Sequence, residues 1–216
     1  MVVLGWSAKR GGIAVNWDAV WNFWLYVDEP IGLVLGVLIV LCLIRQKVWA
    51  WPLGVFYVLV SITVLLEAKL YANLALHVLG FLPLNLYGWY VWIFGGEQKD
   101  DLPVTRSSVV LLCVLGAICA LGGVVFGYLF NTYTDAALPY TDNVIFMMSF
   151  AAMYLTAHKK IENWLVWVVV NVLSVVIYIN QGLWLYGLLY FAYFFMAIWG
   201  FFEWRQSMLQ RESSTS

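Results

Sequence analysis

The chain has 216 residues, of which 64% are apolar and only 11% are charged, whereas soluble proteins average about 45–50% and about 25%. A soluble domain of this length could not bury so much apolar surface, so the composition excludes one and predicts a protein whose solvent is lipid. The formal net charge of −1 argues against nucleic acid as a partner.

Residues 1–29 are predicted to lie on the membrane rather than across it. A basic pair near the start is followed by Gly-Gly and not by an apolar stretch, so the segment does not have the pattern of a cleavable signal peptide. Within Asn16–Tyr26, Trp17, Trp21 and Trp24 are spaced four and three residues apart and would share one face of a helix. This stretch is too short to cross a bilayer, which predicts an interfacial amphipathic helix.

Seven apolar stretches approach the length of about 20 residues that a membrane-spanning helix needs. They are Pro30–Leu43 with an extension into Arg45, Trp51–Leu70, Ala72–Phe94, Ser108–Phe130, Leu138–Ala157, Ile161–Gln181 and Leu183–Trp204. The first is the shortest. The sequence therefore predicts an all-α polytopic membrane protein with seven transmembrane helices.

The two ends of the chain resemble each other at a constant offset. At this offset Trp49 aligns with Trp164, Leu70-Tyr71 with Leu185-Tyr186, and Trp89 with Trp204. One extra span between two triplets leaves both triplets in the same orientation, which makes a parallel repeat. The predicted 3+1+3 organisation places the first repeat at 30–96, a linker helix with its loops at 97–137, the second repeat at 138–205 and a cytoplasmic tail at 206–216.

The loops that join the spans differ in charge between the two sides of the membrane. One side receives eight basic residues, namely Arg45, Lys47, Lys99, Arg106, Lys159, Lys160, Arg205 and Arg211, and the other side receives Lys9, Arg10 and Lys69. Lys and Arg are enriched in cytoplasmic loops. We therefore expect a cytoplasmic C-terminus and an N-terminus outside.

The sixth span carries the most regular polar pattern. Trp164, Trp167, Asn171, Ser174, Tyr178 and Gln181 follow one another at steps of 3, 4, 3, 4 and 3. Polar side chains are costly in a bilayer and usually face a cavity or one another. Helix packing needs one or two such residues, so we interpret this stripe as a ligand-binding face, whereas Ser61, Thr63 and Ser149 are interpreted as helix-packing residues.

Two other spans supply further candidates. The third carries Asn73, His77, Asn85 and Tyr87, and the seventh carries Trp184, Tyr186, Tyr190 and Tyr193. Pro83 is the only proline well inside a span, and it is expected to kink the third helix. His77 is open to two interpretations, as a satisfied core residue or as a substrate ligand.

Charged groups and catalytic motifs are missing from the middle of the spans. No Asp, Glu, Lys or Arg lies there, so no proton relay or buried ion pair is evident. HExxH, GxSxG and Walker motifs are absent, and Cys42, Cys113 and Cys119 have no metal-ligand spacing, so no metal or cofactor is expected. These features favour a transporter of a ring-bearing neutral or delocalised-charge compound. A membrane-embedded enzyme using His77 and Asp142, or a sensor or structural subunit, remains an alternative.

Three stretches resemble the PnuC family of vitamin-precursor transporters. They are LYANLALHVLGFLPLNLYGWYVW at Leu70–Trp92, ENWLVWVVVNVLSVVIY at Glu162–Tyr178 and GLWLYGLLYFAYFFMAIWGFFEW at Gly182–Trp204. The most specific piece is NWxxWxxxNxxSxxxY. The family motif LYAD followed by LQ is altered here, because Asn73 stands in place of the Asp and His77 in place of the Gln.

The resemblance implies a fold related to the SWEET sugar transporters. It also implies uptake of nicotinamide riboside across the bacterial inner membrane by facilitated diffusion, with trapping by a cytosolic riboside kinase. Similar relatives take thiamine or riboflavin, and a sugar is a further alternative. A homotrimer is suspected from the same resemblance.

The expected binding residues divide by the chemistry of the riboside. Its ring would stack on Trp167, Tyr178, Trp184 and Tyr87, its amide would pair with Asn171 and Asn85, and its ribose hydroxyls would bond to Ser174, His77 or Asn73. Trp164, Tyr186 and Tyr190 complete the expected set.

Overall fold

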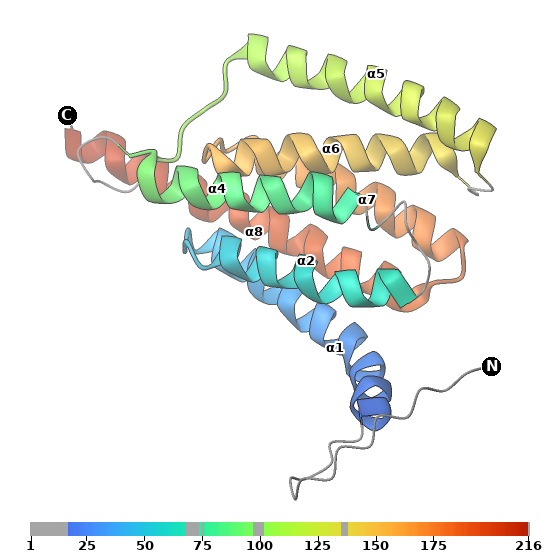
Figure 1. The fold of residues 1–216 in the computed structure, drawn as a ribbon. Coiled ribbons are helices and arrows are strands. Elements are labelled where there is room, and N and C mark those ends of the chain that lie inside the picture. Colours follow the sequence, from blue (N-terminus) through green and yellow to red (C-terminus); the bar gives the residue numbers. More distant parts are fainter. Residues whose placement is uncertain (1–16, 68–73, 75, 97–101, 135–137, 216) are drawn as a thin grey trace, which may run out of the picture.

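The structure, a computed structural model, describes residues 17–67, 74, 76–96, 102–134 and 138–215, and for 17–30, 64, 65, 67, 214 and 215 it describes the backbone alone. Over these ranges the chain is mainly helical (Figure 1). The elements are α1 (Trp17–Ile44), α2 (Ala50–Glu67), the π-helical segment η1 (His77–Phe81) continuing into α4 (Leu82–Phe94), α5 (Val109–Tyr133), α6 (Pro139–Ala157), α7 (Asn163–Asn180) and α8 (Trp184–Thr215). The predicted all-α class is confirmed, and each of the seven predicted spans falls on a helix wherever its residues are described.

The N-terminal helix differs from the prediction. The sequence predicts a separate interfacial helix over Asn16–Tyr26, but α1 runs from Trp17 through the first predicted span to Ile44. The separate helix boundary is therefore wrong. Pro30 lacks an N–H and so removes one helical hydrogen bond, which an apolar helix tolerates when it bends, and the ribbon of α1 does change direction along its length (Figure 1). Its position at the membrane surface stays a prediction.

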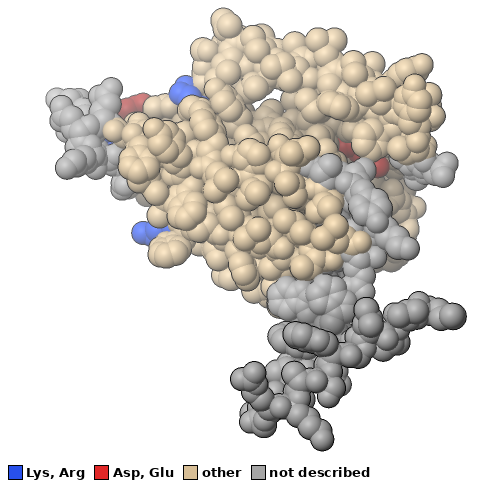
Figure 2. Space-filling model, viewed as in Figure 1, with Lys and Arg blue, Asp and Glu red and all other residues tan. Residues whose placement is uncertain are grey.

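Three helices of the described chain are long and apolar enough to cross a membrane, over Val109–Tyr133, Asn163–Asn180 and Trp184–Ser213. The apolar parts of α1 and α2, Ile31–Ile44 and Ala50–Thr63, are shorter. Figure 2 shows one face that is almost free of charge, with the few visible Lys, Arg, Asp and Glu atoms toward its left and right ends. This surface is suited to contact with lipid tails.

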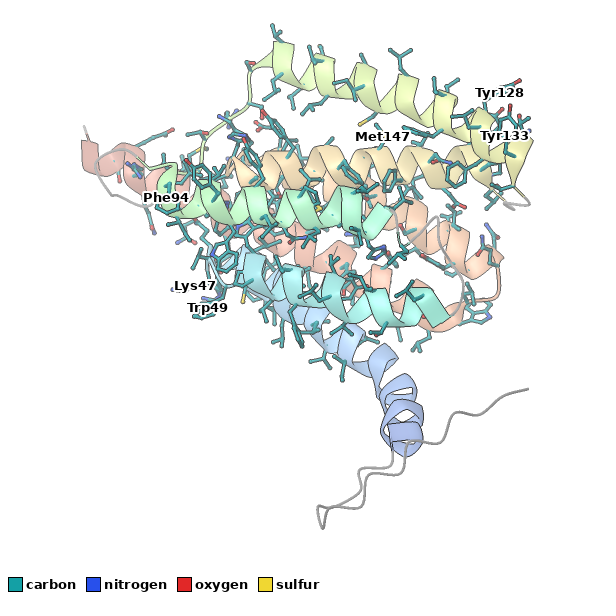
Figure 3. All side chains as sticks on the ribbon, viewed as in Figure 1. Lys47, Trp49, Phe94, Tyr128, Tyr133 and Met147 are labelled. Carbon is teal, nitrogen blue, oxygen red and sulfur yellow. The ribbon has the colours of Figure 1, made fainter. Side chains whose placement is uncertain are left out.

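Six helices pack in a closed ring. Around the ring, α1 packs against α2, α2 against α4, α4 against α6, α6 against α7, α7 against α8, and α8 back against α1. In contrast, α5 packs mainly against α6 and forms an outer layer (Figure 1). Met147 lies in this contact (Figure 3), where a side chain on Gly122 of α5 would collide with it.

The third predicted span contains a distortion just before Pro83. The Leu82 N–H donates to the His77 carbonyl five residues back, so the helix takes the wider π pattern over His77–Phe81. Proline has no N–H, and its ring crowds the carbonyl four residues earlier, which favours an opened turn at this point. The expected kink thus takes the form of a π turn.

The loops after α1 and α6 have the same backbone geometry. Each begins with a left-handed residue, Gln46 (φ 54°) after α1 and Lys159 (φ 46°) after α6. The hydrogen bonds that close the two turns measure 2.8 Å each, from Lys47 N–H to the Cys42 carbonyl and from Lys160 N–H to the Leu155 carbonyl. These are Schellman caps, whose left-handed position is usually glycine.

Four buried tryptophans form a layer across the end of the bundle where these two loops lie. This tryptophan layer consists of Trp51, Trp92, Trp164 and Trp204. Ring centroids are 5.6 Å apart in the edge-on pair Trp51–Trp92, 5.4 Å in the edge-on pair Trp164–Trp204, and 6.2 Å between Trp92 and Trp204. Aromatic contacts of this kind add to the stability that burial alone provides.

Both edge-on pairs depend on a glycine. A side chain at Gly88 would collide with the Trp51 ring, and one at Gly200 would collide with the Trp164 ring. Trp51 is therefore the packing counterpart of Trp164. The predicted pairing of Trp49 with Trp164 is wrong, since Trp49 is 68% exposed and Trp164 is 2% exposed. Tryptophans are so frequent here that spacing could not choose between neighbours, whereas burial does.

Candidate functional site

The polar stripe predicted on the sixth span lies on α7 and faces the interior of the ring. Asn171 and Ser174 are only 4% and 3% exposed, whereas Val169 and Val176 on the opposite face are exposed. Trp164 is buried at the same face, and Trp167 packs partly buried beside the tryptophan layer. The helix orients in this way because its polar and apolar faces alternate with helical period.

Asn171 and Ser174 make no side-chain hydrogen bond to any other residue that the structure describes. The other small polar residues differ, since Ser61 and Ser149 donate to the carbonyl four residues earlier in their own helices, at 2.9 and 2.8 Å. Thr63 likewise donates to the carbonyl three residues earlier, at 2.8 Å. Buried polar groups are normally paired. The two unpaired side chains on α7 therefore indicate a partner from outside the chain.

A second asparagine, Asn85, comes from α4 and is also buried. Its Nδ2 donates to the Phe81 carbonyl at 2.8 Å, and its Oδ1 faces α2 at Gly54, where a side chain would collide with it. Asn85 lies seven residues from Trp92, and Asn171 lies seven residues from Trp164. Seven helical residues rise by about 10.5 Å, so the two amides lie at a similar depth beneath the tryptophan layer.

Stacked tyrosines occupy the far end of α7. Tyr178 stacks on Tyr186 and on Tyr190, with ring centroids 5.6 and 5.2 Å apart, and Tyr190 meets Tyr193 edge-on at 5.9 Å. Tyr178 lies four turns beyond Trp164 on the same helix, which corresponds to about 21 Å. The polar side chains of α7 therefore lie between the tryptophan layer and this tyrosine cluster.

Two further tyrosines at this end of the bundle, Tyr57 and Tyr193, are not among the expected binding residues. Tyr57 of α2 approaches α1 at Gly32, and the Tyr193 hydroxyl approaches α1 at Gly36. At Gly36 an added side chain would collide with the Tyr193 hydroxyl, so the glycine is what allows this approach, whereas at Gly32 it would make only an ordinary contact with Tyr57. A glycine pair four residues apart in the first span, facing a tyrosine-rich span, is the signal that could have identified them.

Other predicted site residues lie elsewhere. Trp184, at the start of α8, is largely exposed. The Tyr87 hydroxyl lies 2.8 Å from His158 Nε2, at the loop after α6, and His77 lies in η1 with its ring edge-on to Phe81 at 5.3 Å. Asn73 lies outside the described residues. The structure thus groups the α7 stripe with Tyr186 and Tyr190 of α8, and does not bring Tyr87 or Trp184 to it.

His158 follows α6 and lies at the end of the bundle that carries the loops after α1 and α6, and its pKa is shifted there. Burial, and secondly the nearby Lys160 ammonium, lower the pKa of His158 below its ordinary value, so its ring is neutral at pH 7 and can share a hydrogen bond with the Tyr87 hydroxyl. Within the described part of the chain, no three His, Cys, Asp or Glu residues are grouped to hold a metal ion.

A polar groove of about 520 Å³ opens at the same end of the bundle. It is lined by Ile44, Arg45, Gln46 and Lys47 from the end of α1 and by Glu203, Gln206, Ser207 and Gln210 from α8. Lys47 and Trp49 mark this end of the molecule in Figure 3, and Tyr128 and Tyr133 mark the opposite end. The groove therefore lies beyond the tryptophan layer, at the surface.

Comparison with known proteins relates this arrangement to one family. Residues 19–206 match the family model described as nicotinamide mononucleotide transporter. The nicotinamide riboside transporter PnuC of Escherichia coli (strain K12) is 29% identical over 210 residues, which cover 86% of this chain and 87% of that protein. The riboflavin/roseoflavin transporter RibM of Streptomyces davaonensis is 25% identical over 207 residues, covering 93% and 92%.

One solved structure has the same fold. The crystal structure of the vitamin B3 transporter PnuC matches with a TM-score of 0.64 and 21% identity, covering 93% of this chain and 95% of that one. At this identity the match concerns the fold alone.

Proposed function

We propose that this chain, which belongs to the family of nicotinamide mononucleotide transporters, takes up nicotinamide riboside across a bacterial inner membrane. The resemblance to the PnuC family in the sequence motifs is confirmed, and the chain is a membrane transporter of that family. The observation that carries the proposed binding site is Asn171, a buried amide with no hydrogen-bond partner among the described residues. The choice of nicotinamide riboside is supported by the similarity to the Escherichia coli nicotinamide riboside transporter.

The chemistry of nicotinamide riboside fits the residues of α7. The compound offers a flat cationic ring, a carboxamide and ribose hydroxyls. The Asn171 side chain presents both a donor and an acceptor, which is what a carboxamide requires, and the Ser174 hydroxyl can pair with a ribose hydroxyl. Trp167 and Tyr178 supply aromatic faces, which attract a delocalised cation.

Riboflavin is the second candidate, because the similar protein RibM is described as a riboflavin/roseoflavin transporter. An amide can also pair with a flavin ring, so Asn171 does not separate the two compounds. Thiamine and sugars remain weaker alternatives. Uptake of each labelled compound into liposomes containing the purified protein would decide among them, and absence of uptake for every compound would favour a sensor or an enzyme.

The proposed mechanism is alternating access by two parallel triplets, α1–α2–α4 and α6–α7–α8. The closed ring of helices, the matched caps and the matched tryptophan pairs support this 3+1+3 organisation. One triplet would rock against the other about a central site. The π turn before Pro83 is a candidate hinge. The glycines on either side of Pro83 are close-packed, Gly80 against the Phe150 ring and Gly88 against the Trp51 ring.

Uptake is expected to run downhill and to ignore imposed ion gradients. No charged residue lies in the middle of a span to couple transport to protons or sodium. In liposomes, the internal concentration of labelled nicotinamide riboside should level off at the external one, with or without a proton or sodium gradient. Accumulation above that level which an ionophore abolishes would contradict facilitated diffusion. In the cell, a cytosolic riboside kinase would trap the product.

The C-terminus is expected in the cytoplasm, with the loop around Asn131 outside. The basis is the distribution of eight basic residues on one side against three on the other. A reporter enzyme that works only in the periplasm should be inactive when fused after Ser216, and active when inserted near Asn131. The reverse pattern would overturn the orientation. A homotrimer in the membrane is part of the same proposal and rests on the family resemblance alone.

A further inference from the structure

We propose that the tryptophan layer, held by a contact between Lys159 and Gln46, is a barrier across the transport path. The barrier lies on the side of the protein that carries the loops after α1 and α6, the loop side. Lys159 is the positioning residue that keeps it closed. The inference rests on the proposed alternating-access function and deepens it, because it assigns one side of the cycle to named residues.

The two triplets meet through matched indole hydrogen bonds. Trp92 Nε1 donates to the Thr156 carbonyl at 3.2 Å, and Trp204 Nε1 donates to the Leu43 carbonyl at 3.0 Å. The donors belong to the third helix of each triplet, Trp92 near the end of α4 and Trp204 within α8, and each acceptor lies near the end of the first helix of the other triplet. These bonds cross between triplets, whereas the edge-on pair of Trp51 with Trp92 lies within one triplet. Separating the triplets here would therefore break the crossing contacts and leave each edge-on pair intact.

Lys159 adds two more contacts that cross the same boundary. Its side chain is buried, its ammonium donates to Gln46 Oε1 at 3.3 Å, and it lies 4.6 Å from the centre of the Trp92 ring. A cation over a tryptophan face is attracted to it, most strongly away from water. Lys159 follows α6 in the second triplet, whereas Gln46 and Trp92 belong to the first, so these two contacts tie the triplets together.

The backbone at Gln46 and Lys159 supports a role for their side chains. Both residues are left-handed at the cap position where glycine would be unstrained. Strained non-glycine residues of this kind persist where their side chains are needed. The two strained side chains are also the ones that meet each other, which a purely structural turn would not require.

The closed layer also contains groups that favour opening. Trp51 Nε1 and Trp164 Nε1 are buried without an acceptor in the described chain, and an unpaired buried donor destabilises the arrangement that holds it. Gln46 lines the polar groove at the surface, so solution on the loop side reaches the contact with Lys159. The contact between Lys159 and Gln46 therefore lies next to water.

The test measures whether solution on the loop side reaches the layer. The parent for this experiment has Cys42, Cys113 and Cys119 replaced by serine and carries Ala197→Cys, at a buried position packed with the layer. A membrane-impermeant methanethiosulfonate is applied to each face of sealed vesicles in turn. Lys159→Met and Gln46→Leu should each raise the rate of modification from the loop side at least about tenfold, the factor that corresponds to 1.4 kcal/mol.

Two further variants test whether the Lys159–Gln46 contact itself keeps the layer closed, or whether any substitution in this loop raises the rate of modification. Lys160→Met is the matched control, because Lys160 Nζ bonds instead to Thr105 Oγ1 at 2.8 Å, and it should react at the parent rate. Lys159→Arg keeps a cation and should return the rate toward that of the parent. Unchanged rates in both Lys159→Met and Gln46→Leu, or an equal rise in Lys160→Met, would overturn the proposal. No substrate is present, so this failure would leave the proposed substrate untouched.

Discussion

Asn171→Ala is expected to weaken the binding of nicotinamide riboside at least about tenfold, which corresponds to 1.4 kcal/mol. Asn171 is buried on the polar face of α7, and its amide has no partner among the described residues. Its loss would leave the carboxamide of the bound ligand without this partner, and an unpaired buried polar group costs about 1–3 kcal/mol. Titration calorimetry on the detergent-purified protein measures the change directly.

Two comparisons make this result specific. Trp167→Ala should also weaken binding at least about tenfold, since it removes a ring beside Asn171 on the same face. Ser61→Ala should bind like the parent, because the Ser61 hydroxyl already bonds to the Tyr57 carbonyl of its own helix at 2.9 Å. If Asn171→Ala retains both the parent's melting temperature and its affinity, the stripe on α7 is a packing surface and the site lies elsewhere.

Trp204→Ala is expected to lower the free energy of unfolding by about 3–5 kcal/mol, the range for removing a fully buried tryptophan. Trp204 is completely buried between Trp92 and Trp164, and its indole bonds to the Leu43 carbonyl. Its removal would leave a cavity where the triplets meet and an unpaired carbonyl. The melting temperature in detergent, followed by far-ultraviolet circular dichroism, should fall by roughly 6–20 °C.

Trp49→Ala is the matched control for that experiment. Trp49 is at the same end of the bundle as the tryptophan layer, but its side chain is mostly exposed and it belongs to no buried cluster of the described residues. Its substitution should change stability by no more than about 0.5 kcal/mol, as at most surface positions. Equal losses in Trp49→Ala and Trp204→Ala would show that the layer is not the core of this end.

The interior is ordered by depth along α7, which explains why these two substitutions report on different properties. Trp164 lies near the start of the helix in the tryptophan layer, Asn171 lies two turns further on, and Tyr178 lies two turns beyond that. The first position is filled by packed rings, and the second holds unpaired polar groups. Loss of packing is expected to affect stability, and loss of the amide is expected to affect binding.

Local patterns in the sequence were sufficient for the class of the fold and for the orientation of α7. Apolar stretches of bilayer length predict helices whatever their neighbours are, because every backbone group is then paired within its own segment. The 3–4 spacing of Asn171, Ser174 and Tyr178 fixes one polar face on any helix. Pro83 distorts its helix for a similarly local reason, the missing N–H.

The motifs at Leu70–Trp92 and Glu162–Tyr178 were also sufficient for the family. The separate N-terminal helix was not predicted correctly, because a proline can either end a helix or bend it, and Pro30 lies within α1. Tyr87 could not be placed either, since its hydrogen bond is to His158, 71 residues further along the chain.

By itself, the sequence of this protein determined which segments are helices, which face of α7 is polar and which family the chain belongs to, since each depends on residues close together in the chain. Only the tertiary structure decided that the packing counterpart of Trp164 is Trp51 and not Trp49, and that Lys159 meets Gln46. Both findings relate residues that lie far apart in the chain, in different triplets. They depend on how rings fill the space beside Gly88 and Gly200 and on two left-handed turns, which no periodic pattern encodes.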